Sequence, residues 1–196
     1  MNEYRSKLGI NVGDYVFCFI GRLVKDKGIE ELVVAFNVLQ GKKSNCKLLL
    51  IGPLETALDP LSDATLQLIS SNENIISVGF QADVRPYLLL ADSFVFPSHR
   101  EGFPNVLLQA GAMGKPSIVT DISGSNEIIE NDVNGHIIPV KNVQELLKTM
   151  QDYTIPKYQF NAHQIRLNIV NRYSNAIVWD AINAFYQEKL HDKGLV

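Results

Sequence analysis

The chain has 196 residues, of which 46% are hydrophobic and 20% are charged, and its formal net charge is −3. This length and composition suit one domain with a buried core, whereas the slight acidic excess argues against a general nucleic-acid-binding protein. No window approaches the roughly 18 apolar residues that a bilayer-spanning helix needs. The N-terminus has no signal-peptide pattern, so we expect a cytoplasmic protein.

The two cysteines, Cys18 and Cys46, lie in or beside apolar, strand-like runs. This placement predicts reduced core residues. No Cys and His spacing fits a zinc site, so the sequence predicts no metal. Of the four histidines, only His99 lies near Glu101 in the loop after the fourth predicted strand, and we interpret it as a loop residue rather than a catalyst.

After a polar stretch over residues 1–14, which is irregular or helical, apolar runs alternate with segments of helical periodicity. The predicted strands are Tyr15–Ile20, Lys47–Ile51, Asn74–Val78, Ser93–Phe96, Ser117–Thr120 and His136–Ile138. The predicted helices between them are Gly28–Gln40, Asp59–Ser71, Val84–Leu90 with Asp83 as its cap, and one entered through Pro104. This alternation indicates an α/β fold with a doubly wound, mostly parallel, Rossmann-like sheet.

Three further helices follow the last predicted strand. The first opens at Asn142, which fits a capping box with Glu145. The others are Lys157–Val170 and Ser174–Leu190, and we expect them to pack on the edge of the sheet. The last one carries Ile177, Ala181, Ile182 and Phe185 on one face. We therefore interpret residues 1–196 as a single domain, with a core over about 15–152 and C-terminal helices over about 156–190.

Ligands of such sheets bind beyond the carboxyl ends of the strands. The first strand runs into a loop, residues 21–28, that places Arg22 and Lys27 before a helix N-terminus. Two cations and free backbone N–H groups suit an oligophosphate. Ordinary solvated charges around a glycine turn explain the local pattern equally well. The loop matches neither a Walker loop nor a dinucleotide fingerprint.

The fourth strand leads into a second candidate loop. Glu101 stands at a helix entrance where Pro104 suits the first helical position. The N–H groups of Gly102, Phe103 and Asn105 would then be free. Gln109 shares a helix face with Asn105, although taken alone it reads as a surface residue. The loop after the fifth strand, residues 121–127, is either a capped helix start shielded by Glu127 or a third loop lining the same site.

Five segments, in this order, resemble the C-terminal, donor-binding domain of a GT-B glycosyltransferase of the retaining GT4 type. They read FIGRLVKDKG, LLLIGP, IISVGFQADVRPYLLLADSFVFPS, EGFPNVLLQAGAMGKP and SGSNEII, and they cover about Tyr15 to Val140. The resemblance implies that Arg22 and Lys27 grip the donor diphosphate and that Glu101 lies near the donor sugar. It implies further donor-binding positions at Gly21, Val78, Gly79, Gly102, Phe103, Pro104, Asn105 and Gln109.

The resemblance implies no cofactor, because the sugar nucleotide is a substrate. It also implies no bound metal. Fixed cations and helix N–H groups can stabilise the charge of the departing nucleoside diphosphate. Gln109 departs from the family pattern, which has a ribose-binding glutamate there. An amide offers one acceptor where a carboxylate offers two, so we expect donor binding weaker by about 1–2 kcal/mol.

The resemblance further implies transfer of a sugar from a UDP- or GDP-sugar to a glycan or lipid-linked acceptor, as in cell-surface polysaccharide synthesis. GT-B enzymes have a second, N-terminal domain with the acceptor site, so we interpret this chain as the donor half. The full enzyme could associate peripherally with the inner membrane face. Two alternatives stay open: a nucleotide-sugar-binding module or subunit that needs a partner domain, and a GT-B-fold sugar-nucleotide epimerase.

Overall fold

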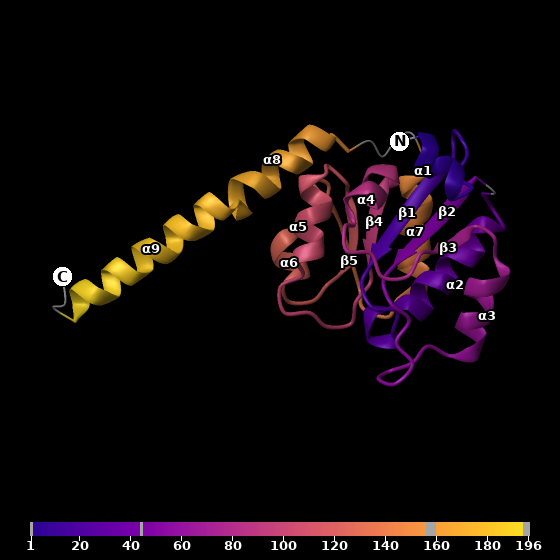
Figure 1. Ribbon diagram of the computed structural model, residues 1–196, viewed down its shortest axis with the longest axis horizontal. Helices are drawn as coiled ribbons and strands as arrows, with labels where there is room; N and C mark the ends of the chain where they lie inside the picture. Colours follow the sequence, from indigo (N-terminus) through magenta and orange to yellow (C-terminus); the bar gives the residue numbers. More distant parts are fainter. Residues whose placement is uncertain (1, 44, 156–159, 194–196) are drawn as a thin grey trace.

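The strands form one parallel sheet in the computed structural model, which describes residues 2–43, 45–155 and 160–193. Their bounds are β1 Tyr15–Ile20, β2 Cys46–Ile51, β3 Ile75–Ser77, β4 Ser93–Phe96, β5 Ser117–Thr120 and β6 Gly135–Ile138. The six-stranded sheet has the order β3-β2-β1-β4-β5-β6, and every pairing is parallel (Figure 1). The predicted fold class is confirmed, and no predicted strand end differs by more than one residue.

Helices connect the strands and cover the sheet. They are α1 Asn2–Lys7, the 3-10 turn η1 Lys25–Lys27, α2 Ile29–Gln40, α3 Asp63–Ser71, α4 Arg85–Leu90, α5 Asn105–Ala112, α6 Ser125–Ile128, α7 Val143–Tyr153, α8 Ala162–Tyr173 and α9 Asn175–Asp192. Right-handed crossovers place α2 and α3 on one face, and α4 and α5 on the other, because the strand order reverses between β3 and β4. Consistent with these layers, α2 packs against α3 and α7, and α5 packs against α6 and α8.

The core lies around β1, the strand between β2 and β4. Phe17, Phe19 and Phe94 are fully buried there, because a strand inside a parallel sheet is covered by helices on both faces. Cys18 and Cys46 are buried and free, which confirms the prediction for these residues. Burial raises the pKa of the Cys46 thiol to about 11.

Several helices begin later than the sequence predicts, and α3 and α4 are two of them. The predicted start of α3 is wrong because Asp59 has a φ of 55°, in the left-handed region, and precedes a proline. Ser62 is the N-cap instead, and its Oγ accepts a hydrogen bond from the Thr65 N–H at 3.4 Å. For α4 the N-cap is Val84, not Asp83. The Asp83 carboxylate still accepts a hydrogen bond from the Arg85 N–H, at 3.0 Å.

The caps of the later helices follow the sequence more closely. Asn142 caps α7 as predicted, since its Oδ1 accepts a hydrogen bond from the Glu145 N–H at 2.9 Å. Asn161 caps α8 through the N–H groups of His163 and Gln164. The predicted helix start at residue 157 lies outside the described residues. Overall, the three predicted C-terminal helices are present as α7, α8 and α9.

The expected packing of the last two helices on the sheet edge is wrong. Helix α8 lies on α5, where Gly111 allows the close approach: a Cβ at this position would collide with the Ile169 side chain. Helix α9 has no buried residue and extends away from the domain as a rod (Figure 1). Phe185 on its predicted apolar face is 57% exposed. Periodicity predicted the apolar face, but it contains no information about what covers that face.

Candidate functional site

The candidate site lies at the carboxyl edge of the sheet, between β1 and β4. The chain runs outward from β1 through β2 and β3, and then returns to continue at β4 on the other side. Strand exits on the two sides of such a switch point diverge, and this leaves room for a ligand. The loops that follow β1 and β4, residues 21–28 and 97–104, lie side by side at this edge because the two strands are neighbours in the sheet.

An ion pair joins the two loops at the switch point. The Lys27 Nζ lies 2.6 Å from the Glu101 Oε1, and the two side chains are 15% and 16% exposed. The Ser98 hydroxyl lies 2.9 Å from the same Glu101 oxygen. Because water is largely excluded here, this contact is stronger than an exposed surface pair. The structure thus brings together Lys27, which is predicted to bind the diphosphate, and Glu101, which is predicted to lie near the sugar. The two residues are 74 positions apart in the chain.

Further polar contacts fix the relative positions of the two loops. The carbonyl of Asp26 accepts a hydrogen bond from the His99 N–H at 2.8 Å, and the Asp26 Oδ2 lies 3.2 Å from the Arg100 Nε. The His99 ring lies 3.0 Å from a carboxylate oxygen of Glu31, in the first turn of α2. His99 therefore has a structural contact in this loop. Together these bonds make the two loops one rigid unit.

Gly28 allows the β1 loop to lie directly on the β4 loop. It has a φ of 68°, and a Cβ at this position would collide with the carbonyl oxygen of Pro97. Gly28 is also the N-cap of α2, and no side chain caps this helix. The first N–H groups of α2 thus begin beside Lys27, in the arrangement that the sequence predicts for an anion site.

Arg22 lies in the same loop, but its environment is different. The residue is exposed, and its side chain makes no hydrogen bond or ion pair with any residue that the structure describes. A cation without a protein partner can turn toward a ligand without first breaking an existing contact. Arg22 is therefore available to an incoming anion, whereas Lys27 already contacts Glu101.

The exits of β2 and β3 continue the same edge. The Gly52 N–H donates a hydrogen bond to the Gly79 carbonyl at 2.9 Å, and Gly52 itself packs against the backbone of Gly21. The carbonyl of Val78, another predicted donor-binding residue, accepts a hydrogen bond from the Gln81 side chain. The three glycines form a row of close backbone contacts. This row places Val78 and Gly79 beside the β1 loop.

The entrance of α5 differs slightly from the prediction. Pro104 is the N-cap rather than the first helical residue, with φ −78° and ψ 97°, and the helix starts at Asn105. Gly102 and Phe103 are exposed, and their N–H groups donate to no residue within the described ranges. The Phe103 ring lies 5.7 Å from the ring of Tyr173 in α8. The predicted free N–H groups at Gly102 and Phe103 are thus present.

Gln109 lies on the helix that follows this entrance, α5. It is exposed on α5 and lines a pocket of about 280 Å³ together with Asn105. The other lining residues come from α5 and from the junction of α8 and α9; they are Leu108, Ala112, Ile169, Val170, Tyr173, Ser174 and Asn175. The structure thus groups Gln109 with the C-terminal helices, and it places Lys27 with Glu101 at the sheet edge.

The loop after β5 both begins a capped helix and lies against the β4 loop. The Glu127 carboxylate accepts a hydrogen bond from the Gly124 N–H at 3.0 Å, so it shields the start of α6. Gly124 also lies against the carbonyl of Gly102, where a Cβ would collide. The loop therefore supports the Gly102 backbone from the side of β5.

The sequence patterns do not single out Ser98, which is fully buried and contacts Glu101. The available signal was a small hydroxyl residue directly after a buried strand, three positions before an acidic residue. Serine is common in such loops, so this signal has low specificity. Only the folded loop shows the contact.

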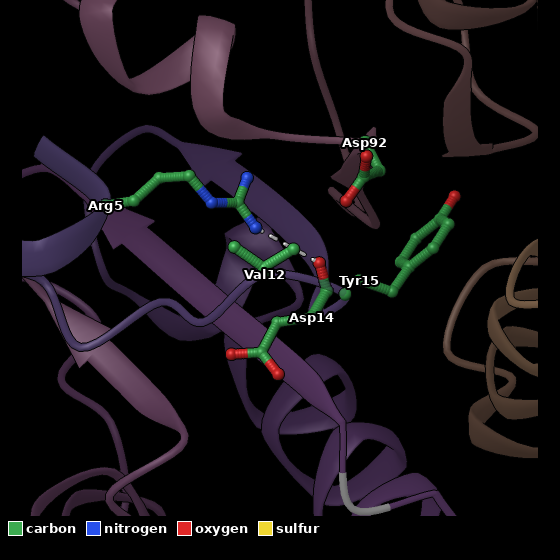
Figure 2. A pocket seen from close by; sticks show the side chains of 6 residues that line it. Arg5, Val12, Asp14, Tyr15 and Asp92 are labelled. Atoms are coloured by element: carbon green, nitrogen blue, oxygen red, sulfur yellow. Dashed lines mark hydrogen bonds between the residues drawn. The ribbon is translucent and has the colours of Figure 1, made fainter. Parts of the chain in front are cut away.

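A second polar group lies at the opposite, amino edge of the sheet. A pocket of about 430 Å³ lies there. It is lined by Gly13 and by the five residues labelled in Figure 2, which are Arg5, Val12, Asp14, Tyr15 and Asp92. The Arg5 Nη2 donates to the carbonyl oxygen of Asp14 at 3.4 Å, and the Asp92 Oδ2 accepts a hydrogen bond from the Val16 N–H at 2.8 Å. These charged groups bond to the backbone at the start of β1, and none of them is a predicted site residue.

Burial perturbs two ionisable groups at this amino edge. It raises the pKa of the Asp92 carboxyl, an effect that the Val16 N–H and the nearby Lys115 oppose. It lowers the pKa of the Lys115 ammonium, an effect that Asp92 opposes. The Lys115 Nζ also donates to the carbonyl oxygen of Ala91, at 2.6 Å. Both shifts therefore arise from structural packing beside the backbone.

Two features are absent from residues 2–43, 45–155 and 160–193. No helix there has both the length and the apolar character that crossing a membrane requires. In the same ranges, no three His, Cys, Asp or Glu side chains gather closely enough to ligate a metal ion.

Comparisons with known proteins agree on one family. Residues 1–155 match the family model described as glycosyl transferases group 1. The capsular polysaccharide biosynthesis glycosyltransferase CapM of Staphylococcus aureus is 30% identical over 97% of this chain and 50% of its own length. The Campylobacter jejuni N,N'-diacetylbacillosaminyl-diphospho-undecaprenol alpha-1,3-N-acetylgalactosaminyltransferase is 28% identical over 91% of this chain and 44% of its own length. The chain thus spans about half the length of the curated relatives that it matches.

Solved structures show the same fold. Anabaena Alr3699/HepE in complex with UDP-glucose matches with a TM-score of 0.79 and 21% identity, over 95% of this chain and 52% of its own. The C-terminal domain of the glycosyl transferase group 1 family protein LpcC from Francisella tularensis matches with a TM-score of 0.76 and 26% identity, over 88% of this chain and 92% of its own. From the matched family model and the shared fold, we conclude that this chain belongs to the glycosyl transferases group 1 family.

Proposed function

We propose that this chain is the donor-binding half of a retaining glycosyltransferase that takes a UDP- or GDP-sugar. The observation that carries the proposal is the meeting of Lys27 and Glu101 at the β1/β4 switch point, with Arg22, whose side chain has no partner among the described residues, in the same loop as Lys27. Family membership supports the reaction class. The complex of Alr3699/HepE with UDP-glucose supports a nucleotide sugar as the ligand of this fold.

The site residues divide the donor between them. Arg22, Lys27 and the first N–H groups of α2 bind the diphosphate, whose negative charge grows as the bond to the sugar breaks. Glu101 and the free N–H groups of Gly102 and Phe103 hold the sugar hydroxyls. The reaction transfers the sugar to an acceptor oxygen, and the nucleoside diphosphate leaves. The charge on the leaving group is stabilised by these fixed cations, so the proposal requires neither a metal nor a cofactor.

The acceptor is a glycan or a lipid-linked saccharide of a cell-surface polysaccharide pathway. The names of two relatives support this class: one acts in capsular polysaccharide biosynthesis and the other on a diphospho-undecaprenol acceptor. We place the acceptor site in a domain beyond this chain, because the chain spans about half of each relative. The chain by itself is then a nucleotide-sugar-binding module that turns over poorly without the acceptor domain.

Calorimetric titration of the chain with UDP, GDP and ADP tests the proposal. We expect one of the uridine or guanosine nucleotides to bind best, and Arg22→Ala to weaken that binding by about tenfold, as loss of a charge-assisted contact does. Lys42→Ala, an exposed lysine beyond the end of α2, is the matched control and should leave the affinity unchanged. Absence of binding by all three nucleotides, or a silent Arg22→Ala, would reject the proposal.

A further inference from the structure

Ser98 is a buried polar residue in the β4 loop. It has a relative exposure of 0%, and its hydroxyl lies near three acceptors. These are the Asp26 carbonyl at 3.2 Å, the Arg100 carbonyl at 3.1 Å and the Glu101 Oε1 at 2.9 Å. A hydroxyl has one proton to donate. Glu101 is both the nearest and the only charged acceptor of the three, so the proton goes to Glu101.

The two partners of Glu101 contact the same oxygen. Lys27 and Ser98 both bond to Oε1, and Oε2 has no hydrogen-bond partner among the residues that the structure describes. The carboxylate is thus held from one side and open on the other. A ligand hydroxyl can bond to Oε2 without displacing either protein partner.

The two partners differ in what happens when a donor binds. If Lys27 also bonds to the diphosphate, as proposed above, its ammonium is shared between two anions and the ion pair with Glu101 weakens, whereas the Ser98 contact to Oε1 is unchanged. We propose that Ser98 is a positioning residue, whose hydroxyl holds Glu101 with Oε2 toward the donor sugar while Lys27 is engaged with the diphosphate. This inference rests on the proposed function.

Ser98 itself is held in place by its neighbours. Its carbonyl accepts a hydrogen bond from the Thr120 hydroxyl at the end of β5. The next N–H in the chain, that of His99, donates to the Asp26 carbonyl, and the preceding carbonyl, that of Pro97, lies against Gly28. Backbone contacts on both sides thus fix the hydroxyl. The Ser98 hydroxyl can therefore hold the Glu101 carboxylate in a fixed position.

The test compares the affinity for a nucleotide with the affinity for its sugar conjugate. Calorimetry would measure UDP against UDP-glucose and UDP-N-acetylglucosamine, and GDP against GDP-mannose. The readout is the dissociation constant of the nucleotide divided by that of its sugar conjugate. This ratio measures how much the sugar adds to binding. In Ser98→Ala we expect this ratio to fall by roughly tenfold, the effect of one hydrogen bond to a charged group, with the affinity for the bare nucleotide retained.

Ser117→Ala is the matched control. Ser117 is equally buried, in β5, and its hydroxyl has no partner among the described residues. The substitution should leave the ratio unchanged. Ser98→Cys keeps the shape and a weak donor, so its ratio should lie between those of wild type and Ser98→Ala. Thermal unfolding of each variant verifies that it is folded.

A double-mutant cycle tests whether Ser98 acts through Glu101. Glu101→Ala should lower the ratio, and adding Ser98→Ala to that variant should lower it no further. Additive losses, an unchanged ratio in Ser98→Ala, or equal weakening of nucleotide and sugar nucleotide would overturn the inference. So would a wild-type chain that binds the sugar nucleotide no more tightly than the nucleotide. If wild type binds no nucleotide at all, the proposed function itself fails.

Discussion

The two edges of the sheet each place a carboxylate near an ammonium group, but they use these charges differently. At the amino edge, Asp92 bonds to the Val16 N–H and Lys115 bonds to the Ala91 carbonyl, so the backbone occupies both groups. At the carboxyl edge, Lys27 and Glu101 bond to each other, and the Glu101 Oε2 has no partner in the described part of the chain. Charges bonded to the backbone stabilise the fold, whereas charges paired with each other can be redistributed to a ligand.

This comparison predicts that substitutions at the carboxyl edge change binding and that substitutions at the amino edge change stability. The largest expected effect is that of Lys27→Ala, which removes a cation from the diphosphate. We expect nucleotide affinity to fall by about 2 kcal/mol, or roughly 30-fold, in calorimetric titration. Thermal unfolding should show that the variant stays folded, because Ser98 still bonds to Glu101 and that side chain keeps some contact with water.

Lys25→Ala is the control for that variant. Lys25 belongs to the same 3-10 turn but is exposed, and its substitution should leave nucleotide affinity nearly unchanged. If both lysine variants bind equally weakly, net charge rather than the switch-point geometry determines binding.

Gln109→Glu tests the residue that lines the pocket between α5 and the C-terminal helices. If position 109 contacts the ribose, the added carboxylate should strengthen nucleotide binding by about 1–2 kcal/mol, since it adds a charge-assisted acceptor. Calorimetry with UDP and GDP measures the change. Gln67→Glu, on the exposed surface of α3, adds the same charge elsewhere and serves as the control. Equal affinities for wild type and Gln109→Glu would remove Gln109 from the ribose site.

Asp92→Ala should have the opposite profile. It removes the acceptor of the Val16 N–H at the start of β1, and we expect the free energy of unfolding to fall by about 1 kcal/mol in urea titration. Asp92→Asn retains an acceptor and should lose less. Nucleotide affinity should be unchanged in both variants. A loss of binding without a loss of stability would contradict the division of roles between the two edges.

The smallest expected effect concerns the rate at which the two cysteines react with a thiol reagent. Burial raises the pKa of both thiols, that of Cys46 to about 11, so few thiolates form near neutral pH. A colorimetric thiol reagent should therefore label the native chain slowly and label it rapidly in urea. Labelling of the native chain at the rate of the unfolded chain would show that the core around β1 opens readily.

Several features of this chain could be predicted from local sequence. The buried strands, the Asn142 cap and the free N–H groups at Gly102 and Phe103 depend on residues close together in the chain. The helix start at Asp59 was wrong because this residue adopts a left-handed conformation, and the cap predicted at Asp83 was wrong by one residue because Val84 is the N-cap. The family resemblance assigned roles to Arg22, Lys27 and Glu101, and the comparisons confirm the family.

The sequence by itself thus determined the elements, their alternation and the chemistry at the strand exits, because these depend on periodicity and on single residue types. Only the tertiary structure decided which of these residues meet. Lys27 and Glu101 are 74 residues apart, and their contact exists because β1 and β4 are neighbours in the sheet. The bond from Ser98 to Glu101 and the exposed position of α9 likewise depend on packing, about which local sequence contains no distance information.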